Sequence, residues 1–109
     1  MSHHFSIDEL NDLFRTTFLT GTVILTPGIR ALPDAVWEEV ITKVRTFDDF
    51  TEDNDPHGEH DFGTFTEPGA GKVFWKIDYY DRDYCNGSPD PADPKVTRRV
   101  LTIMLAEEY

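Results

Sequence analysis

The chain has 109 residues, and its 21 acidic residues outnumber its 10 basic residues, which gives a formal net charge of −11 at pH 7. This charge argues against direct contact with nucleic acid or with an anionic membrane, because both attract basic patches. It favours a basic protein partner, a cation, or solubility alone. The length predicts a single domain that covers residues 1–109.

Cysteine usage and hydropathy indicate the compartment. Cys85 is the one cysteine, so no disulfide can form within the chain, as is usual in a reducing cytosol. No apolar run approaches the roughly 18 residues that a membrane span needs, and the first residues lack the features of a signal peptide. We therefore expect a cytoplasmic protein, and the sequence does not determine its oligomeric state. His3 and His4 are expected to belong to a frayed end.

Two helices and a strand are predicted in the first half of the chain. Ser6 and Glu9 form a capping-box pattern, and apolar residues then recur at helical spacing, which predicts a helix over residues 6–18. The β-branched run at 22–26 is bounded by glycine and proline and predicts a short strand. Its continuous apolar character indicates a buried position. Residues 33–43 predict a second helix with one apolar face.

The middle of the chain predicts strands around a turn-rich segment. Alternation over residues 44–50 indicates a strand that leads into the turn residues 53–58. Residues 59–66 and 72–81 then predict a hairpin around the loop 67–71. The acidic turn segment is expected at one end of this hairpin.

The last part of the chain predicts an irregular loop followed by a helix. Three prolines stiffen residues 82–94, and Asp93 and Pro94 have the pattern of a third helix start. Alternation over residues 100–105 also fits a strand, which is the competing prediction. The order of elements, α-β-α-β-β-β-α, predicts an α+β domain in which helices pack on one face of a mostly antiparallel sheet.

Four sequence runs, NDPHGEHDFG, VFWKIDYYD, SPDPADP and TRRVLTIMLAEEY, together resemble a bacterial family catalogued as domain of unknown function 3768. The resemblance covers residues 11–109. It implies one compact domain, often encoded on plasmids or other mobile elements, and it implies no activity. The family pattern often carries an aromatic residue at the position of His57, which makes His60 the better candidate for a ligand.

The strongest chemical signal is the run of acidic residues without a base between Arg45 and Lys72. Carboxylates spread over the end of a sheet can imitate the charge of a phosphate backbone and attract the basic groove of a nucleic-acid-binding protein. The leading hypothesis is a non-enzymatic, DNA-mimic-like inhibitor of a nuclease or an RNA-guided complex, of the antirestriction or anti-CRISPR kind. The candidate binding residues are Asp48, Asp49, Glu52, Asp53, Asp55, Glu59 and Asp61.

An enzyme or a metal site in the segment DNDPHGEHD is the alternative hypothesis. His60, Asp55 and Glu59 are its candidates, because imidazole and carboxylate groups together suit transition metals. The spacing matches neither a calcium loop nor the helical zinc motif, so no metal or other cofactor is assigned. For catalysis, Asp78 or Tyr80 across the hairpin would orient the ring of His60 as a base. A structural alternative treats the acidic residues as caps of turns.

Overall fold

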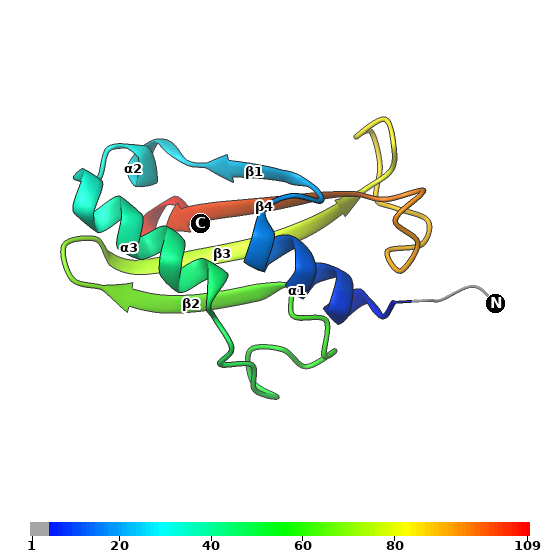
Figure 1. Cartoon of the computed structure of the whole chain (residues 1–109), viewed down its shortest axis with the longest axis horizontal. Helices are drawn as coiled ribbons and strands as arrows, with labels where there is room; N and C mark the ends of the chain where they lie inside the picture. The colour runs from blue at the N-terminus through cyan, green and yellow to red at the C-terminus, as the bar shows by residue number, and fades with distance from the viewer. Residues whose placement is uncertain (1–4) are drawn as a thin grey trace.

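The computed structural model describes residues 5–109, so His3 and His4 lie outside the described residues. It contains one four-stranded sheet with helices packed against it (Figure 1). This architecture confirms the predicted α+β class with a mostly antiparallel sheet. The elements are α1 (Ile7–Thr17), β1 (Thr22–Leu25), α2 (Pro27–Arg30), α3 (Asp34–Arg45), β2 (Phe62–Glu67), β3 (Gly71–Tyr80), β4 (Arg98–Leu105) and the 3₁₀-helix η1 (Ala106–Glu108).

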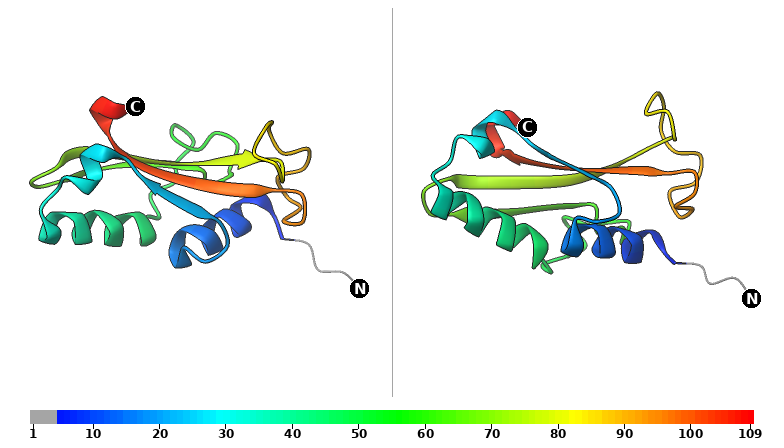
Figure 2. Two further views of the ribbon diagram at one scale, coloured as in Figure 1. Left: turned by 90° about the horizontal axis from the view of Figure 1, so that it is seen from above. Right: turned by 45° about the horizontal axis from the view of Figure 1, so that its top comes forward.

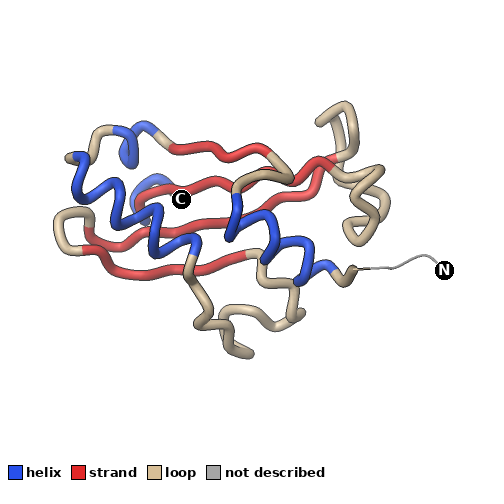
Figure 3. The backbone as a smooth tube through the Cα atoms, in the orientation of Figure 1, coloured by secondary structure: helices blue, strands red, loops and turns tan. Residues whose placement is uncertain are grey.

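The sheet has the strand order β1-β4-β3-β2, with β4 and β3 in the middle (Figure 3). β2 and β3 form the predicted hairpin, in which Gly63 lies opposite Trp75. Gly69 in the turn between them has a φ of +93°, a conformation that glycine adopts without strain. β3 and β4 are antiparallel, whereas β1 and β4 are parallel. The hairpin prediction is confirmed.

The helices α1 and α3 lie on the same side of the sheet (Figure 2). Alternation along β3 directs Trp75 and Ile77 toward these helices, and both side chains are buried. Phe14 of α1 and Val44 of α3 are fully buried in the same cluster. The short η1 lies on the other side of the sheet (Figure 2). Within residues 5–109, no helix has the length and apolar character that crossing a membrane requires.

The helix α1 begins as the sequence predicts. The Glu9 N–H donates to the Ser6 hydroxyl oxygen at 3.4 Å, and the Glu9 carboxylate accepts the Ser6 N–H at 3.0 Å. These two bonds form the predicted capping box. The helix ends at Thr17, and the residue that caps it, Phe18, has a φ of 60°, the left-handed conformation common at helix ends. Its buried face is not purely apolar, because Asn11 and Arg15 are also buried.

The predicted third helix after Pro94 is wrong, and the competing strand is correct. β4 is a central strand that pairs with β1 and β3. Leu101 and Ile103 are buried toward the helices, and Val100 and Met104 are buried on the other face. A strand that is buried on both faces has a nearly continuous apolar run, and such a run has no clear period of two. The period alone therefore could not decide between helix and strand.

β1 lies in a different position from the one its sequence predicts. Residues 22–26 have the continuous apolar character of a buried strand, but β1 is at the edge of the sheet. Val23 and Leu25 pack against the core, whereas Ile24 is 46% exposed on the other face. The prediction of a buried strand is wrong because one face of β1 has no covering helix.

The predicted strand over residues 44–50 does not form. The helix α3 continues to Arg45, and the backbone then follows an irregular path. Phe47 and Phe50 both pack against Trp75, although residues three apart in a strand would point to opposite faces. The apolar residues that suggest a strand are therefore anchors of a loop.

Candidate functional site

The acidic segment forms a loop, residues 46–61, that connects α3 to β2 and is called the acidic loop (Figure 1). Its aromatic residues attach it to the core. Phe47 and Phe50 pack edge-to-face with Trp75, with ring centroids 5.4 and 6.1 Å away. Phe50 also stacks on His60, with ring centroids 3.8 Å apart. These contacts hold the two ends of the loop together.

His60 faces a carboxylate on each side of its ring. Its Nδ1 lies 3.0 Å from both carboxylate oxygens of Asp12 in α1, and its Nε2 lies 3.8 Å from Oδ2 of Asp55. The sequence predicts Asp78 or Tyr80 as the partner of His60, and this prediction is wrong. Both residues lie on the sheet face away from α1, as alternation along β3 requires.

Asp55 caps the acidic loop from inside and does not lie on its surface. Its side chain is 5% exposed, and its carboxylate accepts the backbone N–H groups of Glu59 at 3.0 Å and of His60 at 3.2 Å. Gly58 and His60 have φ angles of +64° and +55° in this turn. A non-glycine residue adopts this region only where its surroundings hold it there. The bonds from Asp55 and the stacked ring of Phe50 provide that restraint.

Asn11 joins Glu59, Tyr79 and Arg99 into one polar network. Its Nδ2 donates to the Glu59 backbone carbonyl at 3.0 Å and to the Tyr79 hydroxyl at 2.8 Å. Its Oδ1 accepts from Nε of Arg99 at 2.7 Å. The Tyr79 hydroxyl in turn donates to the Glu59 carboxylate at 2.9 Å. Burial raises the pKa of Tyr79, and the bond to Glu59 acts in the same direction, so the phenol remains a neutral donor.

Asp61 lies half-buried where the acidic loop enters β2. Burial raises the pKa of its carboxyl group, and the negative charge of Glu59 raises it further. Its backbone carbonyl accepts the N–H of Ile77 at 2.8 Å. Three of the seven predicted binding residues, Asp55, Glu59 and Asp61, are therefore directed at least partly into the molecule.

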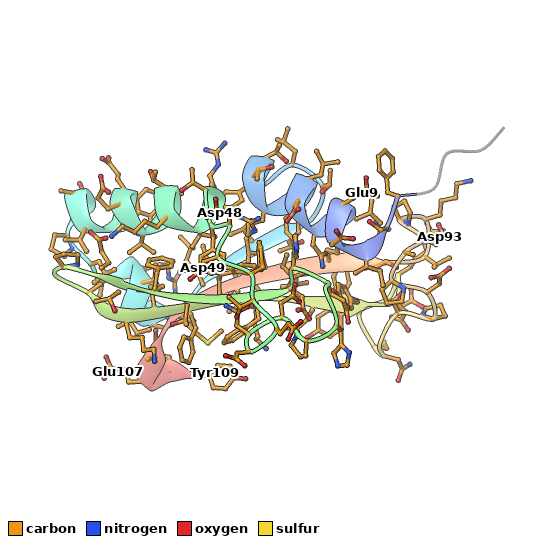
Figure 4. The ribbon with its side chains drawn as sticks, turned by 90° about the horizontal axis from the view of Figure 1, so that it is seen from below. Glu9, Asp48, Asp49, Asp93, Glu107 and Tyr109 are labelled. Atoms are coloured by element: carbon orange, nitrogen blue, oxygen red, sulfur yellow. The ribbon has the colours of Figure 1, made fainter. Side chains whose placement is uncertain are left out.

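The other four predicted binding residues lie on the outside of the acidic loop. Asp48, Asp49, Glu52 and Asp53 are exposed. Within the described part of the chain, their side chains form no hydrogen bond or ion pair. Figure 4 shows Asp48 and Asp49 on the segment that leaves α3. The structure thus divides the predicted acidic set into an inner group and an outer group.

The three candidates for a metal site are already engaged within the protein. Nδ1 of His60 faces Asp12, the carboxylate of Asp55 accepts backbone N–H groups, and the carboxylate of Glu59 accepts from Tyr79. Across residues 5–109, no group of three or more histidine, cysteine, aspartate or glutamate side chains is arranged to hold a metal ion. What these side chains form is a set of mutual bonds that fixes the acidic loop on α1.

Some residues of this site were missed by sequence reasoning. Asn11 and Arg15 of α1 and Arg99 of β4 carry much of the bonding, and none was a candidate. The Arg15 guanidinium donates to the Val44 carbonyl at 2.9 Å and lies 5.1 Å from the Trp75 ring centroid. The available signal was the spacing of Asn11 and Arg15, four residues apart beside the apolar face of α1. Polar residues buried at such positions need bonding partners.

Comparisons with curated proteins and with solved structures give no match. A family model described as a protein of unknown function (DUF3768) matches residues 25–108. The match runs from the end of β1 to η1, so it includes the acidic loop as well as Glu59, Tyr79 and Arg99 of the polar network. This match spans more than half of the chain, so the chain belongs to the DUF3768 family of proteins of unknown function.

Proposed function

We propose that this protein is a non-enzymatic acidic interaction protein whose acidic loop binds a basic protein partner. The observation that carries the proposal is the exposure of Asp48, Asp49, Glu52 and Asp53 without a basic partner among residues 5–109. Carboxylates that have no internal partner are available to pair with an external one. The aromatic contacts of the loop hold these groups in place before binding, which lowers the entropy cost of association.

The bases that precede the acidic loop do not neutralise it. Lys43 forms an ion pair with the buried Glu67, and Nε of Arg45 donates to the Thr16 carbonyl at 3.0 Å. No further lysine or arginine follows in the sequence until Lys72. The loop therefore carries a local excess of negative charge, which would steer a basic surface toward it at low ionic strength.

The contacts of His60 support a role in holding the acidic loop. A general base needs a ring nitrogen within hydrogen-bond reach of its substrate. Here Nδ1 bonds to Asp12, Nε2 lies 3.8 Å from the Asp55 carboxylate, Phe50 stacks on one face of the ring, and the side chain is 27% exposed. This arrangement supports a role for His60 in holding the loop conformation, and the loop then presents its outer carboxylates.

A nucleic-acid-handling protein is the partner that this chemistry fits best. Such proteins have basic grooves that recognise closely spaced phosphates, and a row of exposed carboxylates offers a similar charge. The resemblance also implies a bacterial, mobile-element setting, in which inhibitors of host defence are useful. We therefore propose a cytoplasmic inhibitor of a nuclease or an RNA-guided complex, of the antirestriction or anti-CRISPR kind.

The test is affinity capture from the host with two matched variants. The first replaces the four outer acids of the loop with lysine, which changes the net charge of −11 by two units at each position. The control makes the same change at four exposed acids outside the loop, Glu38, Glu39, Asp83 and Glu107. Circular dichroism and urea unfolding establish that both variants remain folded. The captured partner is then titrated against wild type and each variant.

We expect the loop variant to lose at least about tenfold in affinity, as the loss of several charge contacts in an interface does, while the control binds like wild type. Binding by wild type should also weaken as salt is added. Equal binding by the loop variant and wild type would refute the proposal. An equal loss of affinity in both variants would show that net charge, and not the acidic loop, determines binding, and would also refute the proposal.

A further inference from the structure

The outer edge of β1 carries backbone groups that have no partner within residues 5–109. β1 is the first strand in the order β1-β4-β3-β2 and forms one edge of the sheet (Figure 1). The Thr26 N–H donates to the Ile103 carbonyl at 3.2 Å, so Thr26 and Ile24 direct their backbone groups toward β4. Alternate residues of a parallel strand point the opposite way, so the N–H and C=O groups of Val23 and Leu25 face outward.

This edge lacks the charges that usually protect an edge strand. Residues 16–29 contain no charged side chain, and this run is the longest of its kind in the chain. Natural sheets discourage pairing at an edge with lysine and other charged residues. β1 instead presents Ile24, which is 46% exposed on the sheet face away from α1 and α3. Pro27, which has no N–H, limits the edge to the residues before it. Such an edge is suited to accept another strand.

The two ends of β1 carry opposite charges on the same face of the sheet. Arg98 is exposed beside Thr22, where β1 begins, and forms no ion pair within the described part of the chain. Glu108 is exposed at the other end, where its carboxylate accepts the Thr26 hydroxyl at 2.6 Å. Alternation along β4 places Arg98 on the same face as Val100, which lines one cavity with Glu108.

We propose that β1 pairs in antiparallel orientation with β1 of a second copy of this chain, which joins the two sheets into one. A two-fold axis reverses the direction of the second strand, so the end that carries Arg98 lies beside the end that carries Glu108 of the second copy. The arrangement is self-complementary, because each arginine gains a carboxylate neighbour. A pair centred on Val23 uses the outward backbone groups of Val23 and Leu25 in both copies.

The position of the acidic loop permits this pairing in a chain with a net charge of −11. The loop leads into β2, which is the edge of the sheet opposite β1. Three strand spacings, about 14 Å, separate the two edges, which exceeds the Debye length of about 8 Å at physiological ionic strength. Pairing through β2 would instead bring two acidic loops together. A dimer joined at β1 leaves both loops at its outer edges, available for the binding proposed above.

The first test measures self-association of the full chain by sedimentation velocity at physiological ionic strength, with no other protein present. Ile24→Lys adds a charge at the edge, and Leu13→Lys is its matched control, because Leu13 is 48% exposed on α1. Arg98→Glu reverses the charge where β1 begins, and Arg82→Glu makes the same change at an exposed arginine of the loop 81–97. Circular dichroism and urea unfolding establish that each variant remains folded.

The second test identifies which edge pairs, by amide hydrogen exchange of the ¹⁵N-labelled chain. The Ile24 N–H faces β4 and should be protected at every protein concentration. The N–H groups of Val23 and Leu25 face outward, so they should exchange fast in dilute protein and slowly in the dimer. A contact made by side chains alone would not change the exchange of these two amides in this way.

We expect wild type and both control variants to form a dimer with a dissociation constant below about 1 mM, and protection of Val23 and Leu25 to rise with concentration. Ile24→Lys and Arg98→Glu should each weaken the dimer at least about tenfold, since a two-fold interface contains every changed residue twice.

Wild type that stays monomeric at about 1 mM, or a dimer in which Val23 and Leu25 exchange as fast as in the monomer, would overturn the proposal. Equal weakening by Ile24→Lys and Leu13→Lys would also overturn it, because the contact would then not depend on the edge. Equal behaviour of Arg98→Glu and Arg82→Glu would overturn the antiparallel arrangement of the two strands. None of these measurements involves the basic partner, so their outcome is separate from that of the function proposed above.

Discussion

Replacing Asn11 with alanine should destabilise this protein more than the loss of one small side chain suggests. Asn11 is fully buried, and its amide bonds to three elements at once. It donates to the Glu59 carbonyl and the Tyr79 hydroxyl, and it accepts from Nε of Arg99. Alanine would leave all three of these buried or half-buried groups without that partner.

The magnitude follows from the type of each bond. A neutral buried hydrogen bond contributes about 0.5–1.5 kcal/mol, and one to a charged group about 1.5–3 kcal/mol. Two neutral bonds and one bond to a guanidinium therefore predict a loss of roughly 3–5 kcal/mol in the free energy of unfolding. A domain of this size is stable by only about 5–15 kcal/mol, so Asn11→Ala should remain folded but with a much lower midpoint.

The assay is urea unfolding followed by tryptophan fluorescence, because Trp75 is fully buried in the core. Thr16→Ala on the exposed side of the same helix is the control, and we expect it to change stability by less than about 0.5 kcal/mol. A loss below about 1 kcal/mol for Asn11→Ala, with an unchanged urea slope, would show that the polar network is not what joins α1 to the sheet.

Two further predictions concern single positions where the acidic loop enters β2. Gly63→Ala should lower the free energy of unfolding by about 1–3 kcal/mol in the same assay, because the added Cβ would lie 2.4 Å from Nε1 of Trp75 and 2.8 Å from a ring carbon of Phe47; unchanged stability would contradict this close packing. Asp61→Asn should be more stable than wild type near neutral pH, because burial and Glu59 raise the folded pKa of Asp61 above its unfolded value, so its ionised form costs stability above the folded pKa. This advantage should shrink as pH falls through the folded pKa toward the unfolded value, and a pH-independent difference in urea unfolding would refute the assignment.

The sequence correctly predicts the elements whose residue pattern has a single physical cause. The capping box of Ser6 and Glu9 and the alternation of β3 are both determined by local bonding or by one covered face, and the structure has both. The sequence of β4 fits both a helix and a strand, because a strand covered on both faces has apolar residues at consecutive positions. In the structure Val100 and Leu101, which face opposite sides of the sheet, are both buried. The exposed edge position of β1 depends on which strand pairs with β4, and no local pattern encodes that.

The candidate site shows the same limit at the level of single residues. Composition predicts that the acidic loop carries many charges, but it does not tell Asp53 from Asp55, two residues apart in one turn. Asp55 is inside because its carboxylate reaches the N–H groups of Glu59 and His60. His60 in turn depends on Asp12 from α1, 48 residues away in the chain. Contacts over such a separation are set by the packing of α1 on the sheet.

The difference between the inner and outer acids of the loop can be measured with a pair of neighbouring variants. Asp55→Ala leaves two backbone N–H groups without their acceptor and releases His60 from its left-handed conformation, so we expect a loss of about 2–4 kcal/mol in stability. Asp53→Ala changes an exposed side chain without an internal bond, so its effect on stability should stay within about 0.5 kcal/mol.

Partner binding should follow the opposite order in the same pair of variants. At a temperature where both are folded, Asp53→Ala should weaken capture of the basic partner, because it removes an outward charge, whereas Asp55→Ala should bind nearly as wild type does. Similar stability losses in the two variants would mean that Asp55 does not cap the loop. A larger binding loss for Asp55→Ala than for Asp53→Ala, in folded protein, would mean that the inner group forms the contact surface, since a carboxylate that is 5% exposed can reach a partner only if the loop opens.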